Sequence, residues 1–103
     1  MPATATRLEK DHMELNLATK KRLRAAAHAL KPVVMIGQHG YTPAVAAAID
    51  EALRDHELIK VRLRGIEREQ RLDVVEAICT DLDAQSVSVV GGVVILYRKR
   101  PVD

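Results

Sequence analysis

The chain of 103 residues is predicted to fold as one two-layer α/β domain, with elements in the order α-β-α-β-α-β-β and a mixed four-stranded sheet. Three observations predict this class. Helical patterns alternate with short runs of β-forming residues as far as residue 83. A glycine pair, Gly91-Gly92, then separates two apolar runs, which is typical of a β-hairpin. Strands separated by helices predict right-handed crossovers and parallel neighbours, and the closing hairpin adds one antiparallel strand.

The first helix is expected over residues 20–31, because Thr19 is a favourable N-cap and Pro32 disfavours a helical residue before it. One side of this helix carries an apolar stripe: Leu23, Ala26, Ala27 and Leu30. Another side carries the basic residues: Lys20, Arg24, His28 and Lys31, with Lys21 beside them. No acidic residue occurs from 20 to 31, so the helix does not neutralise its own basic side.

The next two elements have clear start signals. The sequence PVVMIG, residues 32–37, predicts a short and largely buried strand with proline at its first position. The second helix is expected to begin at Thr42-Pro43, because threonine caps a helix and proline suits its first position. The core face of this helix should hold Val45, Ala48, Ile49, Ala52 and Leu53.

Residues 57–65 alternate in polarity, which predicts a strand with one buried and one cationic face. The buried face would hold Ile59, Val61 and Leu63, and the other face Lys60, Arg62 and Arg64. A third helix is expected over about residues 69–83, with inward side chains Leu72, Val75, Ile78, Cys79 and Leu82. The last strand is apolar at both odd and even positions, so both of its faces should be covered, and the first helix should cover part of the second face.

Composition limits the functional classes. Apolar residues make up 48% of the chain, as expected for a packed domain, and the net charge of +2 does not by itself indicate a nucleic-acid partner. A single cysteine excludes an internal disulfide, and no apolar run approaches a membrane span. We therefore expect a cytoplasmic monomer without a membrane partner.

Residues 1–16 are expected to be a disordered arm, residues 17–100 one domain, and residues 101–103 a tail.

The stretch GQHG, residues 37–40, permits two interpretations. Glycine leaves a backbone amide unshielded, so a phosphate could approach Gly37 and Gly40 while the following helix offers its N-terminal N–H groups. His39 could add a hydrogen bond. Alternatively, the glycines serve only the corner between a strand and a helix. The nucleotide-binding patterns GxxxxGK[ST] and GxGxxG are absent.

The basic residues of the first helix and the second strand also have alternative interpretations. Beside an amide-rich loop, lysine and arginine would contact phosphates rather than read bases. They could instead form an ordinary solvated surface, or the chain could be a protein-interaction module that docks an acidic partner, with GQHG as a turn.

Nothing in the sequence indicates an enzyme, a metal site, a cofactor or a small-molecule substrate. The four histidines lack the close spacing of metal ligands, and the lone cysteine completes no such set. Cys79 falls on the core face of a predicted helix, where a small buried hydrophobe is expected rather than a nucleophile.

Four stretches carry a family resemblance: LATKKRLRAAAHALKPVVMIGQHGYTPAV, AIDEALRDHELIKVRL, VVEAICTDL and VVGGVVILYR. The most specific part is LKPVV-x-IG-x-x-G-x-T followed by HELIKV. From about Leu17 to Arg98, the chain resembles the CRM domain, named for chloroplast RNA splicing and ribosome maturation. It is most similar to the free-standing bacterial YhbY-like proteins.

The resemblance implies an RNA-binding fold like the C-terminal domain of bacterial translation initiation factor three. It also implies a GxxG loop that clamps RNA backbone as a KH-domain loop does, and association with precursors of the large ribosomal subunit. The loop maps to Gly37, Gln38, His39 and Gly40, followed by Tyr41 and Thr42. Many members carry a basic residue inside this loop, and its absence here shifts binding to the basic residues Lys20, Lys21, Arg24, His28, Lys31, Lys60, Arg62 and Arg64.

Overall fold

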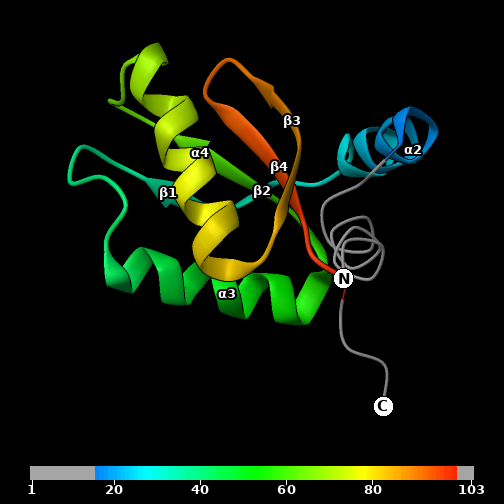
Figure 1. Ribbon diagram of the computed structural model, residues 1–103, viewed down its shortest axis with the longest axis horizontal. Helices are drawn as coiled ribbons and strands as arrows, with labels where there is room; N and C mark the ends of the chain where they lie inside the picture. Colours follow the sequence, from blue (N-terminus) through cyan, green and yellow to red (C-terminus); the bar gives the residue numbers. More distant parts are fainter. Residues whose placement is uncertain (1–15, 100–103) are drawn as a thin grey trace, which may run out of the picture.

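The computed structural model describes residues 16–99, which form three helices and a four-stranded sheet (Figure 1). The elements are α2 (Leu17–Ala27), β1 (Pro32–Ile36), α3 (Pro43–His56), β2 (Leu58–Leu63), α4 (Arg68–Leu82), β3 (Gln85–Val90) and β4 (Val93–Tyr97). The predicted element order and mixed sheet are confirmed. The predicted tail and, except for Asn16, the predicted arm lie outside the described residues. No helix among residues 16–99 is long and apolar enough to cross a membrane.

The strand order is β1-β2-β4-β3. β1 is parallel to β2, and β4 is antiparallel to both β2 and β3. β2 and β3 therefore run in the same direction but are not neighbours, contrary to the expectation from the connecting helix. The reason is that β4, the most apolar strand, takes the position between them, where both of its faces are covered.

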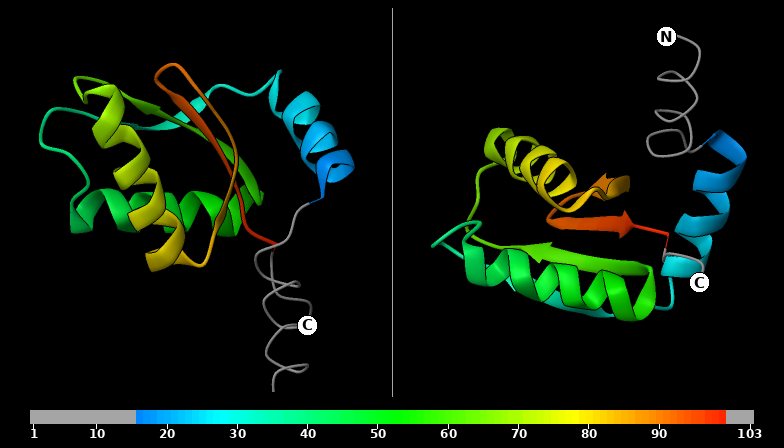
Figure 2. Two further views of the ribbon diagram at one scale, coloured as in Figure 1. Left: turned by 45° about the horizontal axis from the view of Figure 1, so that its top comes forward. Right: turned by 60° about the horizontal axis from the view of Figure 1, so that its bottom comes forward.

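Two apolar clusters lie on the two faces of the sheet. The main core packs β1, β2 and β4 against α3 and α4, and its largest fully buried side chains include Ile36, Ile49, Leu53, Ile59 and Ile78. On the other face, α2 covers only a small cluster at one end of the sheet (Figures 1 and 2). That cluster holds Ala27, Val87 and Ile95, with Leu23 packed against it. This confirms that both faces of the last strand are covered, partly by the first helix.

The first helix begins and ends earlier than predicted. Asn16, not Thr19, is the N-cap: its side-chain Oδ1 accepts a hydrogen bond of 2.8 Å from the Thr19 N–H. The helix ends at Ala27, because the chain needs residues 28–31 to turn into β1 before Pro32. Of the predicted apolar stripe, Ala27 is buried and Leu23 half-buried, whereas Ala26 and Leu30 are exposed.

Three further burial predictions are wrong. Ala48 on α3 is exposed rather than inward, because it lies at the margin of the face on which Ile49 and Leu53 are buried. β1 is mostly exposed rather than buried, with Val33 51% and Met35 53% accessible, because it is an edge strand and α2 does not reach across its outer face. Leu72 is 62% exposed rather than inward, and it lies with Arg68 and Gly91 around a shallow hollow. The N-terminal turn of α4 therefore extends to the β-hairpin turn, beyond the part of the helix that packs on the main core.

Candidate nucleic-acid interface

The GxxG loop, residues 37–40, is a tight turn between β1 and α3. The Gly40 N–H donates a 2.9 Å hydrogen bond to the Gly37 carbonyl oxygen, which closes the turn. Gly40 has a φ of +76°, a conformation that side chains disfavour, so the turn itself requires this glycine. The two central residues, Gln38 and His39, are exposed at the tip.

Gly37 has no such internal requirement. Its φ is not in the left-handed region, and a Cβ atom built at this position would meet nothing within 4 Å. The turn-only interpretation of GQHG therefore explains Gly40 but not Gly37. A missing side chain at an open position leaves the backbone accessible to a molecule outside the fold.

The start of α3 lies next to the loop and is built as the sequence predicts. The Thr42 hydroxyl accepts a 3.2 Å hydrogen bond from the Val45 N–H, and Pro43 takes the first helical position. The helix N-terminus carries the positive end of its dipole, which favours an anion nearby. Thr42 thus has a structural role as cap, whatever it contacts outside the fold.

Tyr41, another predicted contact residue, is directed inward. Its side chain packs against the main core, and its hydroxyl is buried without a partner in hydrogen-bonding geometry among the described residues. Burial, reinforced by the nearby Asp81 carboxylate, raises the pKa of Tyr41 to about 12. The ring therefore supports the loop from below and is not an exposed stacking surface.

Three loops meet at this edge of the sheet, because β1, β2 and β3 all end here. The Arg64 N–H donates to the Ile36 carbonyl oxygen at 2.8 Å, which places Arg64 beside the GxxG loop. A Cβ atom on Gly65 would lie 3.8 Å from Gln38 Cβ. The turn between β3 and β4 lies so close to the end of β2 that a Cβ atom on Gly92 would be 2.8 Å from the Leu63 carbonyl oxygen.

A row of basic residues connects this edge to the opposite end of the sheet. Lys60 and Arg62 alternate along β2 with the core residues Val61 and Leu63, and Arg64 follows just beyond the strand. At one end, Lys60 Nζ lies 3.4 Å from the His28 carbonyl oxygen, next to α2. At the other end, Arg64 adjoins the GxxG loop. The row therefore crosses the sheet face that α2 leaves uncovered.

The predicted basic residues are consequently spread along the sheet and not gathered at the loop. α2, with Lys20, Lys21 and Arg24, packs at the end of the sheet where β2 begins, whereas the loop follows the end of β1. His28 is the C-cap of α2 and keeps helical backbone angles, one turn after Arg24. Lys31 lies in the connection to β1 and does not continue the helical stripe as expected. The β2 row joins the two regions.

The sheet separates the charges of the described chain. Every described Asp and Glu lies within residues 50–57 or 67–83, on α3, α4 and their caps. No acidic residue occurs in the segments that form α2, the four strands and the GxxG loop, which are residues 16–42, 58–66 and 84–99. On the acidic side, Asp50 pairs with Arg98 and with Arg54, and these contacts lower the pKa of its carboxyl group. One face of the protein is thus strongly basic although the net charge is only +2.

Two arginines at the same edge were not among the predicted site residues. Arg71 joins two loops, because it donates to the Ile66 carbonyl oxygen at 2.9 Å and to the Gly91 carbonyl oxygen at 3.0 Å. Arg68, at the start of α4, is exposed beside the hairpin turn. In the sequence, both arginines stand among acids in the polar stretch IEREQR. Only the fold shows that this stretch lies next to the hairpin turn.

Among residues 16–99, no group of three or more histidine, cysteine, aspartate and glutamate side chains could hold a metal ion. Cys79 is half-buried against the main core, and burial raises the pKa of its thiol. A thiol with a raised pKa is a poor nucleophile at neutral pH.

The fold and this surface define a class: a two-layer α/β domain with a GxxG loop at the end of a parallel edge strand and a basic face free of acids. The chain belongs to the CRS1/YhbY (CRM) domain family, whose model matches residues 15–98. The predicted family resemblance is thereby confirmed.

The chain is similar to several proteins along most of their lengths. It is 37% identical over 89 residues to a probable RNA-binding protein of Pseudomonas aeruginosa, covering 86% of each chain. It is 43% identical over 84 residues to an RNA-binding protein of Haemophilus influenzae, covering 80% of this chain and 85% of the relative. Among solved structures, a hypothetical Staphylococcus aureus protein proposed to bind RNA has a TM-score of 0.76 at 27% identity, covering 87% of this chain and 94% of the other.

Proposed function

We propose that this chain is a non-enzymatic RNA-binding protein that grips the RNA backbone with its GxxG loop and basic face. The observation that carries the proposal is Gly37, where neither backbone conformation nor packing accounts for the missing side chain. Membership of the CRM family and the RNA-binding names of its relatives support RNA as the ligand.

In the proposed mechanism, one phosphate sits at the loop, next to the backbone N–H groups of residues 37–39 and the N-terminus of α3. The neighbouring phosphates meet Arg64, Arg62 and Lys60 in turn, and the strand continues toward α2. Backbone amides and flexible cations recognise phosphate without reading bases, so sequence preference at these contacts is low. His39 at the loop tip adds a hydrogen-bond donor.

We further propose that the RNA is ribosomal and that the protein associates with precursors of the large ribosomal subunit, as a cytoplasmic monomer without a cofactor. The family resemblance supports this assignment. Sucrose-gradient sedimentation of cell lysate tests it: the protein should migrate with large-subunit particles and be released by ribonuclease. Migration only at the top of the gradient, even at low salt, would exclude it.

The structure provides a matched pair of variants for the loop. Gly37→Ala adds one methyl group in open space, and Gly37→Asp adds a negative charge at the same place. The fold should tolerate both, because nothing lies within 4 Å of the new Cβ atom. RNA affinity should fall slightly for Gly37→Ala and at least about tenfold for Gly37→Asp, since a carboxylate repels the phosphate and competes for the amides.

Fluorescence anisotropy with a labelled single-stranded RNA measures these affinities, and circular dichroism checks that both variants remain folded. If folded Gly37→Asp binds RNA as tightly as the wild-type protein, the loop is only a turn. Gly40 is less suitable for this test, because any side chain there adds backbone strain to the effect on binding.

A further inference from the structure

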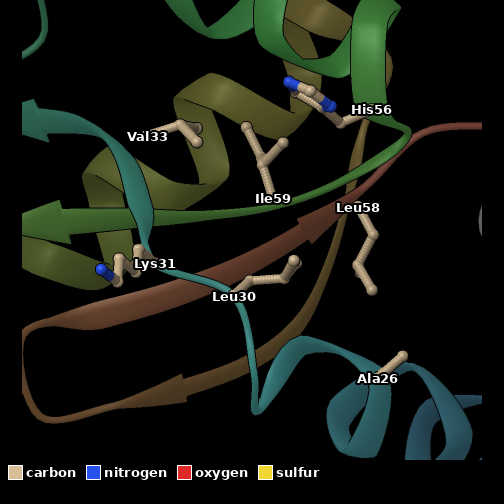
Figure 3. Close-up of a pocket in the computed structure, with 7 residues that line it drawn as sticks. All are labelled: Ala26, Leu30, Lys31, Val33, His56, Leu58 and Ile59. Carbon is tan, nitrogen blue, oxygen red and sulfur yellow. The ribbon is translucent and has the colours of Figure 1, made fainter.

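A pocket of about 480 Å³ lies at the α2 end of the basic row, where α2, β1, β2 and α3 approach one another (Figure 3). Its walls are mainly aliphatic, from Leu30, Val33, Leu58 and Ile59. Two basic side chains, Lys31 and His56, also line it, and no carboxylate does. Leu30 is 39% and Val33 51% exposed, so solvent reaches these apolar walls.

The start of β1 gives this pocket a polar rim. The pairing of β1 with β2 shifts register between Pro32 and Val34, which leaves Val33 outside the ladder. β1 is also an edge strand, so its outward N–H and C=O groups have no strand beside them in the described chain. The backbone of Val33, which lies outside the ladder, thus borders an aliphatic pocket, an arrangement that favours a flat ligand with apolar faces and a polar edge.

We propose that this pocket binds one unpaired nucleobase of the RNA, an inference that rests on the proposed RNA-binding function. A nucleobase has two apolar faces for the aliphatic walls and a polar edge for the Val33 backbone and the His56 imidazole. The phosphate attached to that nucleotide lies near Lys31. The next phosphates lead to Lys60 and Arg62, because Lys60 reaches the His28 carbonyl oxygen beside the pocket.

The charge of the surroundings favours this occupant over an apolar peptide. Lys31 lines the pocket, Lys60 lies at its end of the basic row, and the segments that contribute α2, β1 and β2 contain no acid. The fourth segment, α3, contributes His56 between Asp55 and Glu57, but neither of these acids lines the pocket. A nucleotide supplies both the apolar ring and the anion that such a site requires, whereas an aliphatic peptide segment supplies only the first. The RNA that crosses this face must then be single-stranded at the pocket, since a paired base cannot enter.

The test compares two labelled probes of equal length and charge, about ten nucleotides each, which covers a typical single-strand site. One is oligouridine, whose bases stack weakly on each other. The other is the same ribose-phosphate chain without bases. The wild-type protein should bind oligouridine about fivefold more tightly, the lower end of what stacking one base on an aromatic side chain contributes, because the walls here are mainly aliphatic.

Two α2 variants locate the base contact. Ala26 lines the pocket and Ala25 does not, although both are exposed on the same helix. Ala26→Phe should fill the pocket and abolish the preference for oligouridine, whereas Ala25→Phe, with the same change in helix propensity, should retain it. Methyl NMR provides a second measurement that needs no variant: oligouridine should shift the signals of the exposed lining residues Leu30 and Val33, and the abasic probe should not.

Equal binding of the two probes by the wild-type protein would overturn the pocket assignment and leave backbone binding intact. A preference for oligouridine that survives in folded Ala26→Phe, with no shifts at Leu30 and Val33, would place the base contact outside this pocket and refute the assignment. Failure of the proposed function is distinguishable, because neither probe would then bind and Gly37→Asp would have no effect to measure.

Discussion

Replacement of Arg62 by glutamine probes the basic row at its centre. Lys60, Arg62 and Arg64 occupy alternate positions, so neighbouring basic residues are about 6.6 Å apart along the sheet. This spacing suits successive phosphates of an extended strand, one phosphate to each cation. For single strands, each neutralised phosphate adds about 0.7 to the slope of log affinity against log salt concentration.

The size of the effect follows from this slope. Between 50 and 200 mM salt, one phosphate contact weakens affinity by about 2.6-fold, and three contacts by about 18-fold. Arg62→Gln should therefore reduce the magnitude of the salt slope by about 0.7. Replacement of all three basic residues should reduce it by about 2.

Arg54→Gln is the matched control. Arg54 is an exposed arginine that pairs with Asp50 on the acidic side, so its loss lowers the net charge by the same amount as Arg62→Gln. Anisotropy titrations at several salt concentrations give both slopes. If the two variants have the same slope, only the net charge matters, and the argument for a phosphate track along β2 is refuted.

Three further predictions concern stability, each measured by chemical or thermal unfolding. Tyr41→Phe should change stability by less than about 1 kcal/mol, because in the described chain the buried hydroxyl has no partner in hydrogen-bonding geometry and only the Asp81 carboxylate lies near it; a larger loss would show that the hydroxyl binds Asp81. Gly92→Ala should destabilise the fold by about 1–3 kcal/mol, since the new Cβ atom would meet the Leu63 carbonyl oxygen at 2.8 Å, and an unchanged midpoint would show that the hairpin yields easily. The pKa of Asp50 lies below its ordinary value of 3.8, chiefly because of Arg98, so the pairing of Asp50 stabilises the fold above pH 3.8 and less as the pH falls further. Asp50→Asn should remove this part of the acid dependence of stability. An unchanged profile of stability against pH would argue against a stabilising role of the pair.

Local sequence signals predicted most of the elements. Thr42-Pro43 started α3 as expected, and the alternation of β2 placed its basic residues opposite its core residues. Because β4 is apolar at both odd and even positions, the sequence indicated that both faces of this strand would be covered. These features succeeded because a cap, a period-two pattern and a strand without a polar face depend on neighbouring residues alone.

The failures concern positions where distant parts of the chain meet. The exception is local: asparagine ranks above threonine as an N-cap, and Asn16 starts α2 earlier than predicted by accepting the Thr19 N–H. Leu72 has the spacing of a core residue, but it lies where α4 reaches the hairpin turn. The pocket lined by Lys31 and His56 has no signal in the sequence, because its walls come from four elements and from the irregular start of β1.

The sequence by itself determined the element order, the GxxG loop and its two possible meanings, and the family. The tertiary structure decided between features that look equivalent in one dimension. Gly37 and Gly40 differ because the turn needs a left-handed residue only at its last position. The acids and the uncompensated basic residues lie on opposite sides because α3 and α4 pack on one face of the sheet, while α2 covers only one end of the other. A chain of weak net charge thereby carries a row of basic residues on a face without described acids, since the sheet holds the two sets of charges apart.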